Sequence, residues 1–343
     1  MKTKILKINP NKIDDNKINE AAEEIKKGNL VAFPTETVYG LGADVFNEKA
    51  ISKIFLAKKR PFNDPLIVHI AHVKELEYLS NQISPMALKL AQAFWPGPLT
   101  LVIKKSCAVS NLVTSGLDTV AVRMPNHKIA LSLIEKSNTP IAAPSANLFG
   151  RTSPTDAWHV IEDLEGNVEI IIDGGKTKIG VESTVVDTTT EPVKLLRAGG
   201  ISIEEIRTVI GEIKIGEKLE NSFRSPGMMD SHYSPKAKLV LIDKKGESQI
   251  KEVISQAVLY HDRGFRVGIM AKEENKEEYK GFQVKVIGKG SELKKCAANL
   301  FSILRDFDKE NYDVIIAESL EKYGIGLAIM ERLKKASVSK SIE

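Results

Sequence analysis

Residues 30–42 read LVAFPTETVYGLG, and this stretch decides the class of fold. Its first four residues, 30–33, form a short apolar run that stops at Pro34, as expected of a buried strand. Immediately upstream, apolar residues recur at helical spacing over residues 16–27, and Gly28 ends that helix. A helix followed by a buried strand predicts an α/β fold.

Downstream of this stretch, the same alternation continues. Apolar residues at helical spacing near residues 50–55 predict a second helix that ends in the basic turn KKRP at residues 58–61, because Pro61 disfavours the helical state for Arg60. Short apolar strands are expected at residues 66–70, 99–103, 120–124, 141–143, 168–172 and 184–186. Several are continuous apolar runs, as in strands covered on both faces. Their short spacing favours a mixed sheet over a regular doubly wound one.

The length of 343 residues suggests about two domains. Periodicity fails between residues 211 and 236 and then returns as a regular alternation of strands and helices, which predicts a smaller Rossmann-like α/β domain with a parallel sheet. We therefore expect a catalytic domain over residues 1–210, a linker over 211–236 and a C-terminal domain over 237–343. The linker carries Met228, Met229, His232 and Tyr233. Such residues favour a linker that packs over a site, and a plain surface crossing is the alternative.

Composition excludes several classes of protein. Lys and Arg number 49 and Asp and Glu 45, so a net charge of +4 is too small and too dispersed to indicate nucleic-acid binding. Only Cys107 and Cys296 occur, far apart, which argues against a disulfide framework or a structural zinc site. The start, MKTKILKINP, lacks the apolar region of a secretory signal, and no apolar run is long enough to cross a bilayer. We expect a cytoplasmic protein with no membrane partner.

Five segments mix buried-strand residues with small hydroxyls, bases and glycines. They are residues 34–42, 58–69, 119–123, 144–153 and 180–184. Each has a simple structural explanation: a glycine-rich turn, a solvated helix end or a helix cap. Their joint occurrence favours a ligand site, since α/β sheets place ligands at strand ends. Gly175-Lys176-Thr177 resembles the end of a P-loop, but Ile170 stands where that motif needs glycine.

The residue types indicate an anionic nucleotide and a small zwitterion. Lys58 and Arg60 are suited to phosphates. Arg123 is suited to a substrate carboxylate, and His69 to a polar substrate group. Further hydroxyl and amide contacts are available from Thr119, Ser145, Asn147 and Ser153. Spacing alone thus predicts a phosphate-ester ligand in an α/β site without a P-loop.

Several separated motifs, in order, resemble the threonylcarbamoyl-AMP synthase family of YrdC-type fold. They are PTETVYGLG at residues 34–42, KKRPFNDPLIVHI at 58–70, VAVRMP at 120–125, PSAN at 144–147 and GVESTVVD at 180–187. The PGMMDSHYSP linker and the trailing α/β domain resemble the long, two-domain form, so the resemblance covers essentially the full chain. It implies a twisted mixed sheet with a basic cleft.

The resemblance also implies an activity. Family members join L-threonine, bicarbonate and ATP, with Mg²⁺, into threonylcarbamoyl-AMP and pyrophosphate. The product serves the threonylcarbamoyladenosine modification of tRNAs that read ANN codons, after being handed to a tRNA threonylcarbamoyl transferase complex. Weak RNA binding is also implied, and no metal ligand is expected from protein side chains.

Site residues carry over by position. Lys58 and Arg60 are the expected catalytic residues. ATP binding falls on Lys58, Arg60, Asn63, Asp64, Thr119, Ser145, Asn147, Ser153, Arg197 and Tyr233, with Tyr233 closing over the nucleotide. Threonine binding falls on Thr37, His69, Arg123, Ala143 and Ser183. A carboxylate facing triphosphate would repel it, so the contact near Asp64 is either through its backbone or shifted to Asn63.

Two alternatives belong to other classes. A double-stranded-RNA-binding module would use the same basic cleft and show salt-sensitive RNA affinity without ATP consumption. A carbamoyl-transfer domain of hydrogenase maturation proteins would share the fold, but those chains carry zinc-finger cysteines that this sequence lacks.

Overall fold

The computed structural model describes residues 2–216 and 233–338, which divide into two compact units. Unit 1 holds residues 2–149, 154–178 and 182–216. Unit 2 holds residues 233–338 together with two short pieces, Gly150–Ser153 and Ile179–Val181. Most of the expected linker, including Met228, Met229 and His232, lies outside the described residues, so the domain limits at 210 and 236 stay a prediction.

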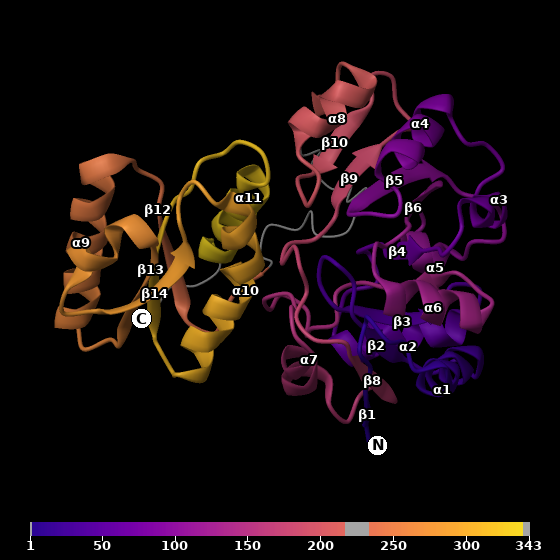
Figure 1. Cartoon of the computed structure of the whole chain (residues 1–343), viewed down its shortest axis with the longest axis horizontal. Coiled ribbons are helices and arrows are strands. Elements are labelled where there is room, and N and C mark those ends of the chain that lie inside the picture. Colours follow the sequence, from indigo (N-terminus) through magenta and orange to yellow (C-terminus); the bar gives the residue numbers. More distant parts are fainter. Residues whose placement is uncertain (1, 217–232, 339–343) are drawn as a thin grey trace. The chain divides into compact units, whose positions relative to one another are not determined.

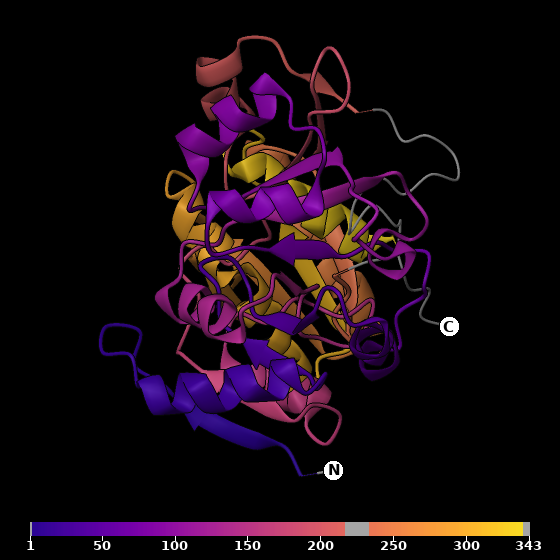
Figure 2. The ribbon, with the colours of Figure 1, turned by 90° about the vertical axis from the view of Figure 1, so that its right-hand side faces the viewer.

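Unit 1 is built on one mixed sheet with the strand order β1-β8-β2-β3-β7-β4-β6-β5-β9-β10-β11. Its strands are β1 (Lys4–Lys7), β2 (Val31–Phe33), β3 (Gly40–Asp44), β4 (Ile67–His69), β5 (Leu99–Lys104), β6 (Thr119–Arg123), β7 (Ile141–Ala142), β8 (Ile170–Asp173), β9 (Thr184–Asp187), β10 (Lys194–Arg197) and β11 (Lys214–Ile215). The sheet contains both parallel pairs, such as β4 with β6, and antiparallel pairs, such as β5 with β6. β1, near the N-terminus, forms one edge of the sheet (Figures 1 and 2). The expected mixed sheet is confirmed.

The two helices that the sequence predicts, at residues 16–27 and near residues 50–58, are present among the helices of unit 1. The helices of this unit are α1 (Asp15–Lys26), α2 (Glu48–Lys58), η1 (Val73–Glu75), α3 (Leu76–Leu79), α4 (Pro85–Phe94), α5 (Asn111–Thr114), α6 (Lys128–Ser137), α7 (Ala157–Leu164) and α8 (Ile203–Ile210). The side chain of Asn47 caps α2 by accepting a hydrogen bond from the amide of Ala50. Lys59 ends the same helix in the left-handed conformation at φ 53°, so the chain turns sharply before Arg60.

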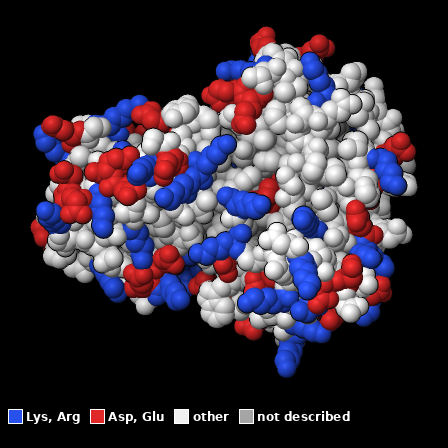
Figure 3. Space-filling view, viewed as in Figure 1, with Lys and Arg blue, Asp and Glu red and all other residues white. Residues whose placement is uncertain are grey.

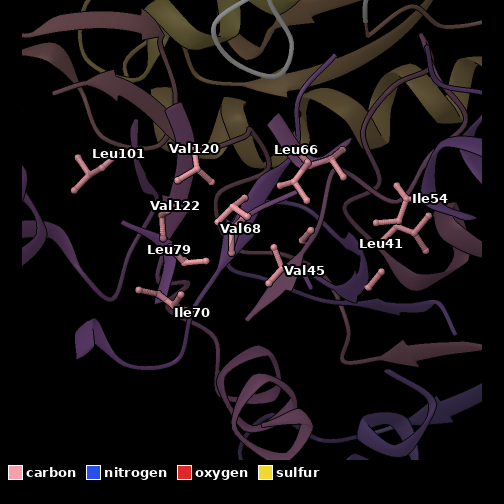
Figure 4. Packing of buried hydrophobic residues seen from close by; sticks show 14 of the residues in the cluster. Leu41, Val45, Ile54, Leu66, Val68, Ile70, Leu79, Leu101, Val120 and Val122 are labelled. Carbon is pink, nitrogen blue, oxygen red and sulfur yellow. The ribbon is translucent and has the colours of Figure 1, made fainter. Parts of the chain in front are cut away.

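Both faces of the unit 1 sheet are covered, as its continuous apolar strands predict. In β2, Ala32 belongs to one buried cluster, while its neighbours Val31 and Phe33 belong to a second. Successive side chains of a strand point to opposite faces, so the two clusters are the two sides of the sheet. Figure 4 shows the first cluster, in which Val68 of β4 and Val122 of β6 lie among helix and loop residues such as Ile54.

One stretch differs from the expected local structure. Residues 40–44, for which a glycine-rich turn was an open explanation, form β3 between β2 and β7. A Cβ on Gly42 would lie 2.7 Å from Ile141 and 2.8 Å from Phe33. Glycine is therefore present here because neighbouring side chains approach the strand closely, and not because the chain turns.

Unit 2 contains a four-stranded, wholly parallel sheet with the order β12-β15-β13-β14. Its elements are β12 (Lys238–Ile242), α9 (Gly246–Asp262), β13 (Val267–Lys272), η2 (Glu273–Tyr279), β14 (Gln283–Gly288), α10 (Leu293–Lys309), β15 (Val314–Glu318) and α11 (Gly326–Ser337). Figure 1 shows α9 on one face of this sheet and α10 with α11 on the other. The expected parallel sheet with helices on its faces is confirmed. If β12 to β15 are numbered 1 to 4, their order across the sheet is 3-2-4-1, whereas strands of the dinucleotide-binding fold run 3-2-1-4. Unit 2 therefore differs from that fold in its strand order.

Charge is spread over the surface as the small net charge predicts. In Figure 3, Lys and Arg are interspersed with Asp and Glu over the face of unit 2 that is drawn. Within the described residues, no helix has the length and apolar character needed to cross a membrane.

Candidate functional site

Lys58, at the end of α2, is almost fully buried, with 1% of its surface exposed. Its Nζ donates hydrogen bonds to the carbonyl oxygens of Ser145 and Asn147, the latter at 2.5 Å. The amide of Phe149 in turn donates to the carbonyl of Lys58 at 2.8 Å. Burial, followed by the charge of Arg60, lowers the pKa of the Lys58 ammonium well below its ordinary value. The basic turn and the PSAN loop, which are far apart in sequence, are thus joined at one point.

Arg60 is held by the turn that follows it. Its Nη2 lies 2.9 Å from Oδ2 of Asp64 and donates to the carbonyl of Pro65 at 2.8 Å, and its Nε donates to the carbonyl of Asp64 at 3.2 Å. The side chains of Arg60 and Asp64 are 3% and 0% exposed, whereas Asn63 is exposed. The Asp64 carboxylate therefore faces Arg60, and its charge is compensated by the guanidinium.

A second buried arginine, Arg123, ends β6 directly opposite His69 of the parallel strand β4. Its Nη1 donates to Oγ1 of Thr37 at 2.8 Å, its Nη2 lies 2.6 Å from Oε2 of Glu36, and its Nε donates to the carbonyl of Gly97 at 3.3 Å. These contacts bring together three of the residues predicted to hold threonine. A fourth, Ala143, is close by in the sheet, because its amide donates to the carbonyl of Ile67 at 2.8 Å.

Two titratable residues of this region escaped sequence reasoning. Glu36 is the only acidic residue of PTETVYGLG, and this lone charge in an apolar and hydroxyl-rich segment is the signal that could have drawn attention to it. His127 precedes α6 and lies within electrostatic range of Glu36; burial lowers its pKa to about 4 against the opposing effect of Glu36. Burial, and then the charge of Arg123, lowers the pKa of His69 to about 3. Both imidazoles are therefore neutral at physiological pH.

Arg197 and Ser183 form a third group. Nε and Nη2 of Arg197 donate to the carbonyl of Ser183 at 3.1 and 2.9 Å, and Nη2 also donates to its Oγ at 3.1 Å. The Ser183 hydroxyl lies 2.8 Å from that of Thr100. Gly199 lets the two segments approach, since a Cβ there would fall 2.2 Å from the Ser183 carbonyl carbon. A residue predicted for ATP and one predicted for threonine are thus in direct contact.

The remaining predicted residues belong to other parts of the two units. Thr119 starts β6 four residues before Arg123, about 13 Å away at the rise of a strand. Ser153 and Tyr233 belong to unit 2, where both are buried. The Tyr233 ring packs on Phe301 with centroids 5.7 Å apart, and Arg332 lies over its ring at 5.3 Å. The basic cleft and the ATP contacts of these three residues stay predictions.

No group of three or more metal-ligating side chains occurs within residues 2–216 and 233–338.

Comparison with known proteins identifies the family. A family model described as "Telomere recombination" matches residues 23–199, and one described as "Threonylcarbamoyl-AMP synthase, C-terminal domain" matches residues 201–338. The chain is 48% identical to the threonylcarbamoyl-AMP synthase of Pyrococcus abyssi over 334 residues, which cover 95% of each chain. The chain belongs to the threonylcarbamoyl-AMP synthase family. The resemblance seen in the motifs is confirmed, as is the long, two-part form.

A relative from a second organism and a solved structure support the assignment. The threonylcarbamoyl-AMP synthase of Bacillus subtilis is 47% identical, with 94% of each chain covered. The crystal structure of P. abyssi Sua5 complexed with L-threonine superposes with a TM-score of 0.93 at 47% identity, covering 98% of both chains. The fold described above is therefore the fold of the family.

Proposed function

We propose that the chain is an L-threonylcarbamoyladenylate synthase, a nucleotidyltransferase that converts L-threonine, bicarbonate and ATP into threonylcarbamoyl-AMP and pyrophosphate. The observation that carries the proposal is the contact of the Lys58 ammonium with the Ser145 and Asn147 carbonyls. It joins the two halves of the Lys-x-Arg and Ser-x-Asn signature into one buried cationic site. The family membership and the near-complete coverage of synthases from two organisms support it.

The buried cations suit ATP. We assign Lys58 and Arg60 to the phosphates, with polar contacts from Thr119, Ser145, Asn147, Ser153, Arg197 and Tyr233. An incoming polyanion favours the charged form of Lys58 and so opposes the effect of burial on its pKa. Because the Asp64 carboxylate is paired with Arg60, we propose that this turn meets ATP through its backbone and that Asp64 positions the guanidinium.

The group around Arg123 suits threonine. Its guanidinium is the natural partner of the substrate carboxylate, and Thr37, His69, Ala143 and Ser183 complete the proposed pocket. The relative from P. abyssi was crystallised with L-threonine, which supports this assignment. Neutral His69 presents an imidazole that hydrogen-bonds a hydroxyl without repelling the neighbouring Arg123.

The reaction needs little acid–base chemistry from the protein. The neutral amine of threonine attacks carbon dioxide, which is in equilibrium with bicarbonate, and loses a proton to give a carbamate. A carbamate oxygen then attacks the α-phosphorus, and pyrophosphate leaves. With a pKa of about 3, His69 is too weak a base to take the amine proton, so we assign no general base. Mg²⁺ bound with ATP would supply charge neutralisation at the phosphates. Positioning and electrostatic stabilisation by Lys58 and Arg60 account for the protein's part.

The product would pass to the complex that transfers threonylcarbamoyl to tRNA, in the cytoplasm.

Pyrophosphate release tests the proposal directly. We expect purified protein with ATP and Mg²⁺ to release pyrophosphate only when both L-threonine and bicarbonate are present, and less with serine or allothreonine in place of threonine. Mass spectrometry should detect threonylcarbamoyl-AMP in the same mixture. Release that is independent of threonine, or none from a folded sample, would reject the function.

A further inference from the structure

A cavity of about 290 Å³ is lined by residues of unit 2, none of which is a predicted site residue. It is lined by Lys244, Lys245, Gly246, Lys272, Glu274, Asn275, Gly290, Ser319, Leu320 and Glu321. These residues end a strand or follow one closely: β12, β13, β14 and β15 all contribute. We call this cavity the carboxyl-edge pocket, since the carboxyl ends of the four parallel strands meet there.

The pocket also lies where the chain diverges between the two faces of the sheet. β12 leads into α9 on one face, whereas its neighbour β15 leads into α11 on the opposite face (Figure 1). In open α/β sheets, ligands bind outside the carboxyl ends of strands at such a divergence, because the loops separate and leave a crevice. The topology of unit 2 therefore predicts a ligand at this pocket, whatever its strand order.

The rim of the pocket includes the first turn of α9, whose N-terminal residues are unfavourable for helix stability. α9 runs for 17 residues, and its N-cap is Lys245, which gives no side-chain hydrogen bond to the first-turn amides. Ser, Thr, Asp and Asn are preferred at this position, and a lysine pair at the positive end of a helix dipole is unfavourable. Two carboxylates offset part of this cost, since Nζ of Lys244 lies 2.8 Å from Glu252 and Nζ of Lys245 lies 2.9 Å from Glu321. An anion in the pocket would reverse this cost, since it would accept from the free amides and attract Lys244 and Lys245.

The floor is preorganised by buried polar groups. Gln249 is fully buried; its Oε1 accepts from Nζ of Lys272 at 2.7 Å, and its Nε2 donates to Oγ of Ser319 at 2.8 Å. The Ser319 hydroxyl donates to the carbonyl of Lys244 at 2.9 Å. Beneath them, buried Glu318 accepts from the side chains of Asn275 and Tyr279. This network fixes the Lys272 ammonium at the pocket wall before a ligand arrives.

We propose that the carboxyl-edge pocket binds a small phosphate ester that also carries hydroxyl groups. The phosphate lies at the first turn of α9, against Lys244, Lys245 and Lys272. Glu274 and Glu321, on the same lining, accept hydrogen bonds from the hydroxyls. The volume is at the lower limit for ligand pockets and fits a sugar phosphate or a mononucleotide rather than a dinucleotide. This proposal does not depend on the synthase reaction.

Glycine-selective NMR tests the proposal on the full chain. The sequence has 23 glycines, two of which, Gly246 and Gly290, line the pocket. With [¹⁵N]glycine-labelled protein, we expect ribose 5-phosphate and AMP to shift the signals of these two glycines saturably at millimolar concentration. Gly40 and Gly42 of β3 report on unit 1, so AMP bound at the proposed synthase site is distinguished. Ribose and adenosine, which lack phosphate, should leave Gly246 and Gly290 unmoved.

Two variants make the test selective. Lys245→Asp should lower the affinity for ribose 5-phosphate at least tenfold and, because Asp is a good N-cap, raise the melting temperature. Lys251→Glu, an exposed position further along α9 that does not line the pocket, should leave the affinity unchanged. Unmoved Gly246 and Gly290 signals with every probe would overturn the proposal, as would equal affinities of wild type and Lys245→Asp. Equal binding of ribose 5-phosphate and plain sulfate would show a non-specific anion only and would also overturn it.

Discussion

The two units place charge differently at their strand ends. In unit 1, Lys58, Arg60, Arg123 and Arg197 are each at most 6% exposed. At the carboxyl-edge pocket of unit 2, a carboxylate, Glu318, is buried instead, and the Lys244 and Lys245 side chains are 51% and 78% exposed. Buried cations are desolvated before a ligand arrives and so are preorganised for charge that develops during a reaction. Exposed lysines are suited to reversible binding. The difference is the one expected if unit 1 holds the proposed catalytic site and the carboxyl-edge pocket is the proposed site of reversible binding.

The buried arginines of unit 1 are also distinguished by their partners. Arg60 and Arg123 each face a carboxylate, from Asp64 and Glu36, whereas Lys58 donates hydrogen bonds to carbonyl oxygens. A carboxylate fixes a guanidinium in both position and charge. Removing such a partner should therefore have a larger effect than altering the polar network of unit 2.

Asp64→Asn should have the largest effect on stability. It leaves the buried Arg60 guanidinium without its anionic partner, and breaking a buried ion pair in this way costs about 3–5 kcal/mol. Urea denaturation at neutral pH measures the loss. The neighbouring Asn63→Ala is the control, since Asn63 is exposed and should change stability by less than about 0.5 kcal/mol. Equal stability of Asp64→Asn and wild type would show that other groups compensate Arg60.

Arg60→Ala tests the catalytic half of the comparison. We expect threonine-dependent pyrophosphate release to fall at least ~10²-fold, because a preorganised donor to the transition-state charge is removed. Lys59→Gln is the matched control: it removes an exposed cation one residue away and should keep most of the activity. A near-normal rate in Arg60→Ala would remove this residue from the proposed mechanism.

Glu318→Gln probes the corresponding group in unit 2. The carboxylate accepts hydrogen bonds from the side chains of Asn275 and Tyr279 and from the backbone amide of Lys272. The glutamine side chain would place its own NH₂ donor against at least one of these donors. We expect a loss of about 2 kcal/mol, the cost of one unsatisfied buried group. No buried cation is left behind, so the loss should be smaller than for Asp64→Asn. Glu247→Gln, at a highly exposed position on α9, is the control. A larger loss than that of Asp64→Asn would reverse the comparison.

The sequence predicts α1, α2 and the parallel sheet of unit 2 because their apolar residues repeat at a helical or strand period. It does not predict β3, whose glycines are required by close side-chain contacts across the sheet. Motifs located Lys58, Arg60, Arg123 and Ser145. They did not reveal Glu36, because its pairing with Arg123 depends on the tertiary fold and has no local periodicity.

The suppressed protonation of His69 gives the most specific prediction. Its pKa is about 3 in the folded chain and about 6.5 when unfolded, because burial and the charge of Arg123 oppose its charged form. Between these values the unfolded state binds a proton that the folded state does not. The contribution of neutral His69 to the free energy of unfolding is therefore complete above pH 6.5 and falls as the pH drops toward 3, by about 1.4 kcal/mol per pH unit.

His69→Gln should remove this contribution, so the free energy of unfolding of the variant should fall less steeply between pH 6 and 4 than that of the wild type. Denaturation at several pH values measures both slopes, and His72→Gln, an exposed histidine three residues away, serves as the control. Identical slopes for wild type and His69→Gln would mean that the His69 imidazole takes up a proton in the folded chain. The assignment of a neutral imidazole beside Arg123 would then be wrong.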